Sequence, residues 1–102
     1  MTTFEVLTPF NEIKEITIIY ADSLFSGYGH RKITVEVEYN NNFKKFSSVT
    51  NCMPLCDEAS DLEGQEKYEA LYDIIASNIE ERIINWIIDV DDEEYESEQE
   101  NN

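Results

Sequence analysis

The sequence predicts an α+β fold, in which an antiparallel sheet of three to four strands carries one long C-terminal helix packed on one face. Two patterns support this prediction. Residues 32–39 alternate apolar and polar side chains, as a strand with one buried face does. Residues 65–90 instead repeat apolar side chains every three or four positions, which is the period of an amphipathic helix. Because the strands precede the helix without strand–helix–strand alternation, a doubly wound parallel sheet is excluded.

The N-terminal elements follow from local residue preferences. Residues 4–7 are expected to form a short strand or an ordered arm. Thr8–Pro9 is typical of a helix start, with Thr as the N-cap and Pro at the first helical position, and predicts a short helix over residues 10–15. Residues 16–21 are rich in β-formers and predict a strand, whereas residues 23–31 hold two glycines and predict a loop. The strand residues expected to share one face are Ile16, Ile18 and Tyr20.

The strand over residues 32–39 is expected to return through a tight turn. Three consecutive asparagines follow it, and asparagine tolerates the positive φ that such a turn requires. A two-residue loop at residues 41–42 places Phe46 opposite Val37. A three-residue loop places Phe43 opposite Tyr39 instead, so the register stays open at this point.

The C-terminal half is expected to be helical and then disordered. Residues 57–63 predict a turn of helix that ends near Gly64. The main helix begins at Gln65 and, at about 24 residues, spans roughly 36 Å. Residues 89–102 hold eight acids and no base, and we expect residues 91–102 to form a disordered acidic tail beyond a single domain of residues 1–90. The apolar stripe of the main helix comprises Tyr68, Leu71, Tyr72, Ile75, Ile79, Ile83, Trp86, Ile87 and Val90.

Charge is distributed very unevenly along the chain. Residues 1–56 hold six acids and five bases, whereas residues 57–102 hold seventeen acids and two bases, and the net charge is −16. Such a chain repels phosphates and attracts basic protein surfaces, so we expect no direct binding of DNA or RNA and no membrane association. No apolar run approaches the roughly 18 residues of a membrane span, and the first residues lack the features of a secretory signal. A cytoplasmic location is therefore expected.

Few residues of this chain are suited to catalysis or to metal binding. Cys52 and Cys56 supply only two thiols, and His30 is distant from them in the sequence. Two ligands do not complete a tetrahedral zinc site, although a dimer would supply four thiolates. A local disulfide is unexpected in a cytoplasmic chain, and the two cysteines are interpreted as small apolar side chains at a strand-to-helix junction. Residues 89–94 are rich in carboxylates but lack the ligand spacing of an EF-hand. We expect no enzyme activity, no metal and no cofactor.

The candidate site is a set of acidic side chains that has two interpretations. One is an ordinary solvated surface on a very soluble protein. The other is a partner-binding surface, because carboxylates spaced about 5 to 6 Å apart along a helix imitate the charge field of a nucleic-acid backbone. The candidate residues on the main helix are Glu66, Glu69, Asp73, Glu80 and Glu81, and two strand residues, Glu36 and Glu38, would add a second row.

Two further apolar residues, Ile84 and Ile88, widen the apolar stripe near the end of the main helix. In one interpretation the N-terminal segment around Phe10 covers them. In the other they form an exposed apolar interface with a second copy of the chain or with a partner.

In its length of about a hundred residues, its few strands, its long acidic helix and its strong negative charge, the chain resembles the small acidic inhibitors of phages and mobile elements. That class includes anti-CRISPR proteins and other DNA mimics. The resemblance covers size, charge and the placement of Glu and Asp, and no residue motif accompanies it. It implies an inhibitor whose target is a nucleic-acid-binding protein with a basic channel, such as a CRISPR-Cas or other defence effector. The alternatives are an immunity or antitoxin-type protein that neutralises a basic toxin, and a homodimeric structural or assembly protein.

Overall fold

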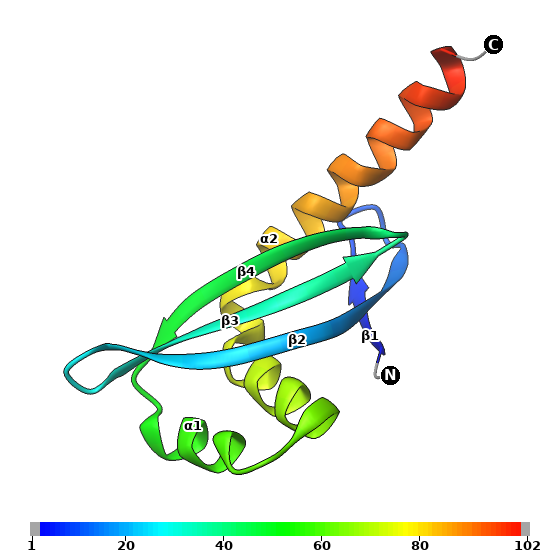
Figure 1. The fold of residues 1–102 in the computed structure, drawn as a ribbon. Coiled ribbons are helices and arrows are strands. Elements are labelled where there is room, and N and C mark those ends of the chain that lie inside the picture. The colour runs from blue at the N-terminus through cyan, green and yellow to red at the C-terminus, as the bar shows by residue number, and fades with distance from the viewer. Residues whose placement is uncertain (1–2, 101–102) are drawn as a thin grey trace.

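The structure, a computed structural model, describes residues 3–100, with side chains described as far as residue 93. A four-stranded antiparallel sheet in the order β1-β2-β3-β4 is followed by two helices, which confirms the predicted α+β fold (Figure 1). The element bounds are β1 (Thr3–Leu7), β2 (Ile13–Gly27), β3 (His30–Tyr39), β4 (Asn42–Thr50), α1 (Met53–Ser60) and α2 (Gly64–Glu100).

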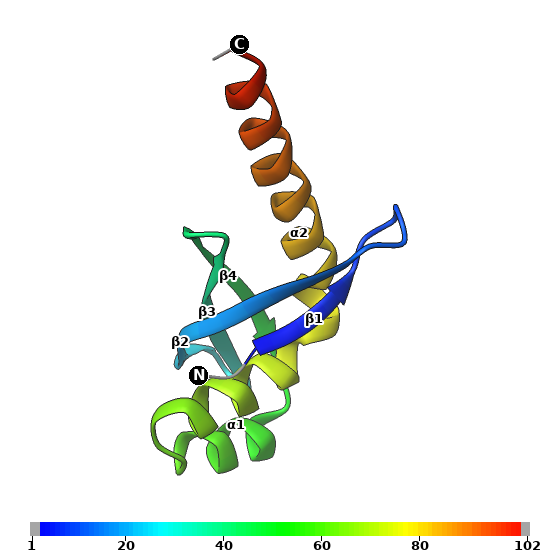
Figure 2. The ribbon, with the colours of Figure 1, turned by 90° about the vertical axis from the view of Figure 1, so that its right-hand side faces the viewer.

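The sheet and α2 form two layers, with the hydrophobic core between them (Figure 2). Strand side chains that alternate along β2 and β3 supply one half of the core, and the stripe along α2 supplies the other half. Burial of each Ile, Leu or Val stabilises the fold by about 1.5 to 3 kcal/mol. Within the described residues, no element covers the second face of the sheet. The most completely buried residues are Ile16, Ile18, Ile33, Val35, Val37, Cys56, Leu71, Ile75, Ile79, Ile83 and Ile87.

The predicted helix after Thr8 is wrong, because this segment is the turn between β1 and β2. The Thr8 backbone N–H donates to the Glu12 carbonyl at 2.9 Å, and the Glu12 N–H donates to the Thr8 hydroxyl at 3.3 Å. Asn11 has a φ of +62°, which a continuing helix would not allow. The Thr–Pro pair therefore begins a hairpin loop, since strand pairing of Leu7 with Ile13 brings the chain back directly.

The predicted loop over residues 23–31 is also wrong. β2 continues to Gly27, and only Tyr28 and Gly29 connect it to β3. Gly29 has a φ of +75°, which a glycine adopts without strain and which lets a two-residue loop close the hairpin. The two glycines suggested a loop, but they lie at the tip of a hairpin, and Leu24 and Phe25 of β2 are exposed.

A β-bulge in β2 changes which side chains face the core. Ile18 pairs with Val37, yet Tyr20 pairs with Glu36, so Ile19 is an extra residue between two ladder positions. The prediction that Tyr20 shares a face with the buried Ile18 is therefore wrong, and Tyr20 is 44% exposed. The alternation of buried and exposed side chains resumes at Ala21, which is buried and pairs with Val35.

The turn between β3 and β4 differs from both registers considered for it. The two-residue loop is Asn40–Asn41, with φ values of +51° and +64°, and Tyr39 pairs with Asn42. Positive φ at both central residues is typical of a type I′ turn, whose twist matches the twist of the flanking strands. Phe46 consequently lies opposite Val35, and both side chains point into the core.

The two helices are longer than the sequence predicts. α1 begins at Met53 rather than at residue 57, with Pro54 in its first turn, where a fixed φ favours helix. α2 has 37 residues, a length of about 55 Å, and extends past the edge of the sheet in both views. Asp91, the first residue of the predicted tail, is helical and contacts the sheet. Of the remaining tail, the side chains of residues 94–100 and the whole of residues 101–102 lie outside the described part, so the predicted disorder there stays a prediction.

Candidate functional site

The candidate acids of α2 lie outside the stripe of the helix that is buried against the sheet. Glu66, Asp73, Glu80 and Glu81 are exposed, and Glu69 is half-buried. They recur at spacings of three, four and seven residues, so most of them share one ridge of the helix. The buried stripe of α2 fixes their positions, since it holds a different side of the helix against the sheet.

The strand acids lie elsewhere. Glu36 and Glu38 are half-buried on the uncovered face of β3, because the residues that alternate with them point into the core. Their neighbours on β4 are Lys45 and Phe43, respectively. The sheet and α2 therefore separate the two sets of acids, and one flat partner surface cannot contact both. The expected second row is not continuous with the helix row.

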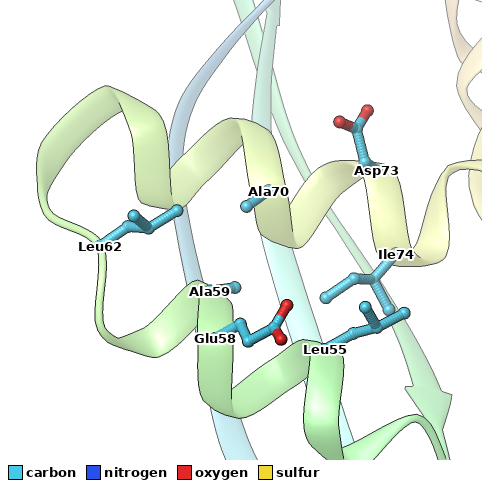
Figure 3. Close-up of a pocket in the computed structure, with 7 residues that line it drawn as sticks. All are labelled: Leu55, Glu58, Ala59, Leu62, Ala70, Asp73 and Ile74. Carbon is cyan, nitrogen blue, oxygen red and sulfur yellow. The ribbon is translucent and has the colours of Figure 1, made fainter.

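The helix row continues instead onto α1, which sequence reasoning missed as part of the site. Asp57 and Glu58 are exposed on α1, and Asp61 is exposed directly after it. α1 runs beside the first turns of α2 in the opposite direction (Figure 3). Asp57 forms an ion pair with Arg31 of β3 at 3.6 Å. Glu58 forms no ion pair with any described residue, and neither does Asp73 of α2. The two helices thus present one acidic surface.

An apolar groove of about 490 Å³ lies within this acidic surface, between α1 and α2 (Figure 3). Part of its apolar lining is exposed, since Leu55 is 50% and Leu62 is 38% exposed. The signal in the sequence was the presence of these two leucines in a segment otherwise rich in acids. The residues that line the groove are Leu55, Glu58, Ala59, Leu62, Ala70, Asp73 and Ile74.

A second hollow, of about 420 Å³, lies farther along α2 beside the loop that follows β1. It brings together three of the candidate residues, Glu80, Glu81 and Ile84, with Leu7 of β1. Ile88 lines a neighbouring, smaller hollow of about 180 Å³ with Phe10 and others. Both isoleucines are half-buried. The N-terminal segment therefore covers them in part, while Phe10 itself is 71% exposed.

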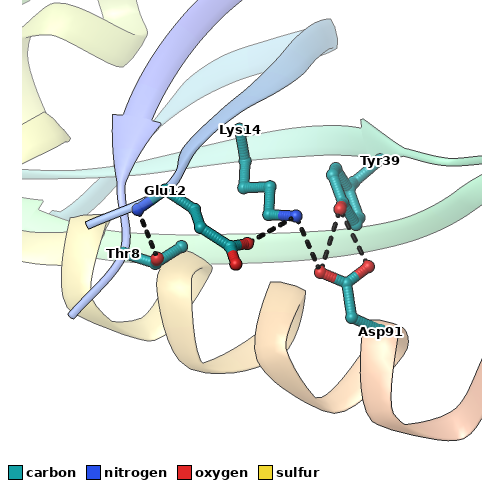
Figure 4. Close-up of polar contacts among 5 residues, drawn as sticks. All are labelled: Thr8, Glu12, Lys14, Tyr39 and Asp91. Carbon is teal, nitrogen blue, oxygen red and sulfur yellow. Dashed lines mark hydrogen bonds and ion pairs between the residues drawn. The ribbon is translucent and has the colours of Figure 1, made fainter. Parts of the chain in front are cut away.

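A polar network fastens α2 to the sheet at this end of the molecule (Figure 4). The Tyr39 hydroxyl donates to both carboxylate oxygens of Asp91, at 2.8 and 3.1 Å. The Lys14 ammonium lies 3.4 Å from Asp91 and 3.1 Å from Glu12. The hydrogen bond to Glu12, together with the nearby charges, raises the pKa of Lys14 above its ordinary value of 10.5. This network has a structural role, because it holds the helix in place.

The cysteines and the histidine are not assembled into a site. Cys52 is exposed at the start of α1, and Cys56 is buried in the core, where burial raises the pKa of its thiol. His30 lies in the exposed end of the β2–β3 hairpin, where its Nδ1 lies 2.9 Å from the Tyr28 carbonyl oxygen. Among the residues that the structure describes, no group of three His, Cys, Asp or Glu side chains is arranged to hold a metal ion.

Comparisons with models of protein families, with curated proteins and with solved structures found no match to this chain. In the described part of the chain, neither helix combines the length and the apolar character that crossing a bilayer requires.

Proposed function

We propose that this protein is an inhibitor that binds a nucleic-acid-binding protein, such as a CRISPR-Cas or other defence effector, and occupies its basic channel. The observation that supports the proposal most is the concentration of exposed acids on α1 and α2. Residues 57–93 hold thirteen acids and two bases. One of these bases, Arg82, donates to the Ser47 carbonyl at 2.8 Å and is thereby held against β4. The surface consequently offers a partner negative charge with little local neutralisation.

Electrostatics favours a basic partner over other kinds. Carboxylates on adjacent helical turns lie about 5 to 6 Å apart, and such a row imitates the charge field of a nucleic-acid backbone, which Arg and Lys neutralise. Attraction between such surfaces accelerates association and orients the two proteins before contact. Glu36 and Glu38 lie on the far side of the sheet, so the proposed contact uses the helices alone.

Affinity capture followed by competition tests this function. The protein is immobilised, exposed to a nuclease-treated lysate, and then eluted at constant salt with duplex DNA, with RNA, or with poly-glutamate of equal charge. We expect DNA or RNA to elute the specific partner at lower concentration than poly-glutamate does. Elution by poly-glutamate alone would favour a basic partner without a nucleic-acid site, as in the immunity-protein alternative.

A charge-reversal variant tests which surface is used. Asp73→Lys, Glu80→Lys and Glu81→Lys together should weaken binding by several kcal/mol if these acids meet desolvated Arg or Lys, but by under about 1 kcal/mol per site at a rim. The fold should survive, because all three side chains are exposed. The control is Glu36→Lys with Glu38→Lys, on the uncovered face of the sheet. Unchanged affinity and salt dependence in the triple variant would contradict the proposal.

A second candidate function, assembly through a homodimer, is favoured by one separate observation. Leu7, Phe10 and Ile13 are all more than half exposed, and two of them line the hollows that hold Ile84 and Ile88. Exposed apolar side chains gathered in this way are typical of a protein interface. Light scattering across a concentration series would test it, with Phe10→Ser expected to abolish any dimer.

A further inference from the structure

We propose that the groove between α1 and α2 binds an amphipathic helix of the partner, whose apolar side chains enter the groove and whose Lys or Arg side chains pair with Glu58 and Asp73. This inference rests on the proposed function in one respect, namely that the partner is basic. It adds the chemistry and the secondary structure of the segment that is recognised.

The shape and lining of the groove suit an apolar side chain. Ala59 and Ala70 are small, and leave space between the two helices. Leu55, Leu62 and Ile74 surround that space, and their side chains lie in the gap between the ribbons (Figure 3). With Leu55 half exposed, the free protein leaves apolar surface in water that a partner would cover. Covering this surface favours binding through the hydrophobic effect, against the costs of association.

The charges around the groove select a basic occupant. The Glu58 carboxylate lies between the helices, and the Asp73 carboxylate points away from α1 on α2 (Figure 3). Neither forms an ion pair with a described residue, whereas the adjacent Asp57 is already paired with Arg31. A cation that approaches the groove therefore finds two carboxylates that no described base neutralises. A second copy seated on this groove by two-fold symmetry would instead bring its own acidic surface, and no cluster of bases, against these carboxylates.

A helix suits this groove better than an extended peptide. The groove lies between two helices that run side by side in opposite directions, joined by residues 61–63. The backbone groups of such helices are satisfied internally, so the groove offers no strand edge to which a peptide could add. A third helix packs on a helix pair through side chains alone, with residues at i, i+3, i+4 and i+7 as anchors.

The test uses a defined probe. A fluorescent, terminally blocked peptide of about 18 residues carries Leu at the i, i+3, i+4, i+7 positions and Lys elsewhere, which makes it an amphipathic basic helix. The control peptide has the same composition in an order without an apolar face. Fluorescence anisotropy of the full chain at about 0.15 M salt, where exposed charges beyond about 8 Å are screened, measures both affinities. We expect the amphipathic peptide to bind at least tenfold more tightly than the control peptide. In NMR spectra it should change the amide chemical shifts of α1 and of the first turns of α2.

Two neutral variants separate the groove from the charge. Ala70→Phe fills the groove without changing the net charge and should weaken the amphipathic peptide at least tenfold. Ser77→Phe, seven residues farther along the same ridge of α2, is the matched control and should leave its affinity unchanged. Circular dichroism and thermal melting show whether Ala70→Phe folds. If it does not, Leu55→Ala, which truncates an exposed side chain lining the groove, takes its place in the test.

Charge reversal completes the test. Glu58→Lys with Asp73→Lys should weaken the peptide more than Glu5→Lys with Glu15→Lys, an exposed cross-strand pair that changes the net charge equally. Equal binding of the two peptides, or no effect of both Ala70→Phe and Leu55→Ala, would overturn the groove inference and leave the acidic-surface function standing. If the peptide binds in the groove but neither DNA nor RNA elutes the captured partner, the proposed function is overturned and the groove inference stands.

Discussion

The contact between Asp91 and the sheet predicts a specific loss of stability when its carboxylate is removed. In Asp91→Ala, the Tyr39 hydroxyl loses an acceptor that now lies at 2.8 and 3.1 Å, and Lys14 loses a carboxylate at 3.4 Å. The prediction concerns the point at which the long helix leaves the sheet. It therefore also tests whether the folded domain extends past residue 90.

The expected magnitude follows from the type and exposure of these contacts. A hydrogen bond to a charged group contributes about 1.5 to 3 kcal/mol, and the lower part of this range applies because the Asp91 side chain is 35% exposed. The ion pair with Lys14 contributes at most about 1 kcal/mol at this exposure. We expect a loss of about 1.5 to 2 kcal/mol, or roughly 6 to 16 °C in Tm for a domain of this size.

Asp92→Ala is the matched control. Its side chain is exposed, and the substitution makes the same change in charge and in helix propensity on the next residue of α2. The difference between the two variants in urea unfolding therefore isolates the network. If Asp91→Ala and Asp92→Ala unfold at the same urea concentration and with the same Tm, the contacts of Asp91 do not hold the helix in solution.

Three further predictions concern the core and the titrating groups. Ile79→Val, in the buried stripe of α2, should lower the free energy of unfolding by about 0.5 to 1.5 kcal/mol, whereas Ile13→Val at a 64% exposed position should change it by less than about 0.5 kcal/mol; similar losses at both sites would contradict the core as described. Burial raises the pKa of Tyr72 above its ordinary value of 10.0, so its stabilising contribution is complete below pH 10 and is lost as pH rises through the folded-state pKa. Urea titrations from pH 8 to about 11 should show falling stability, and a Tyr72→Phe variant with an identical fall would refute this assignment. Finally, a thiol reagent at neutral pH should modify Cys52 in the native protein and both thiols after denaturation, because Cys56 is buried and has a raised pKa; rapid modification of both in the native state would show that the core opens.

The sequence by itself determined the class of the fold and the distribution of charge. Alternation over residues 32–39 predicted which side of β3 is buried, and helical periodicity predicted the stripe of α2, because both patterns record the burial of one face within a single element. The acidic character of the C-terminal half follows directly from the number of Asp and Glu residues in it. These properties are local, and local patterns are sufficient to predict them.

Only the tertiary structure decided which side chains share a surface. The bulge at Ile19 removed Tyr20 from the buried alternation of β2 and left its ring beside Tyr68 of α2, and a change of one residue in a turn shifted the β3–β4 register. Glu36 was separated from the helix acids because α2 covers the other side of the sheet, whereas Glu58 joined them because a short connection folds α1 back against α2. Positions so far apart in the chain become neighbours through long-range packing, and the period of a single element carries no information about that packing.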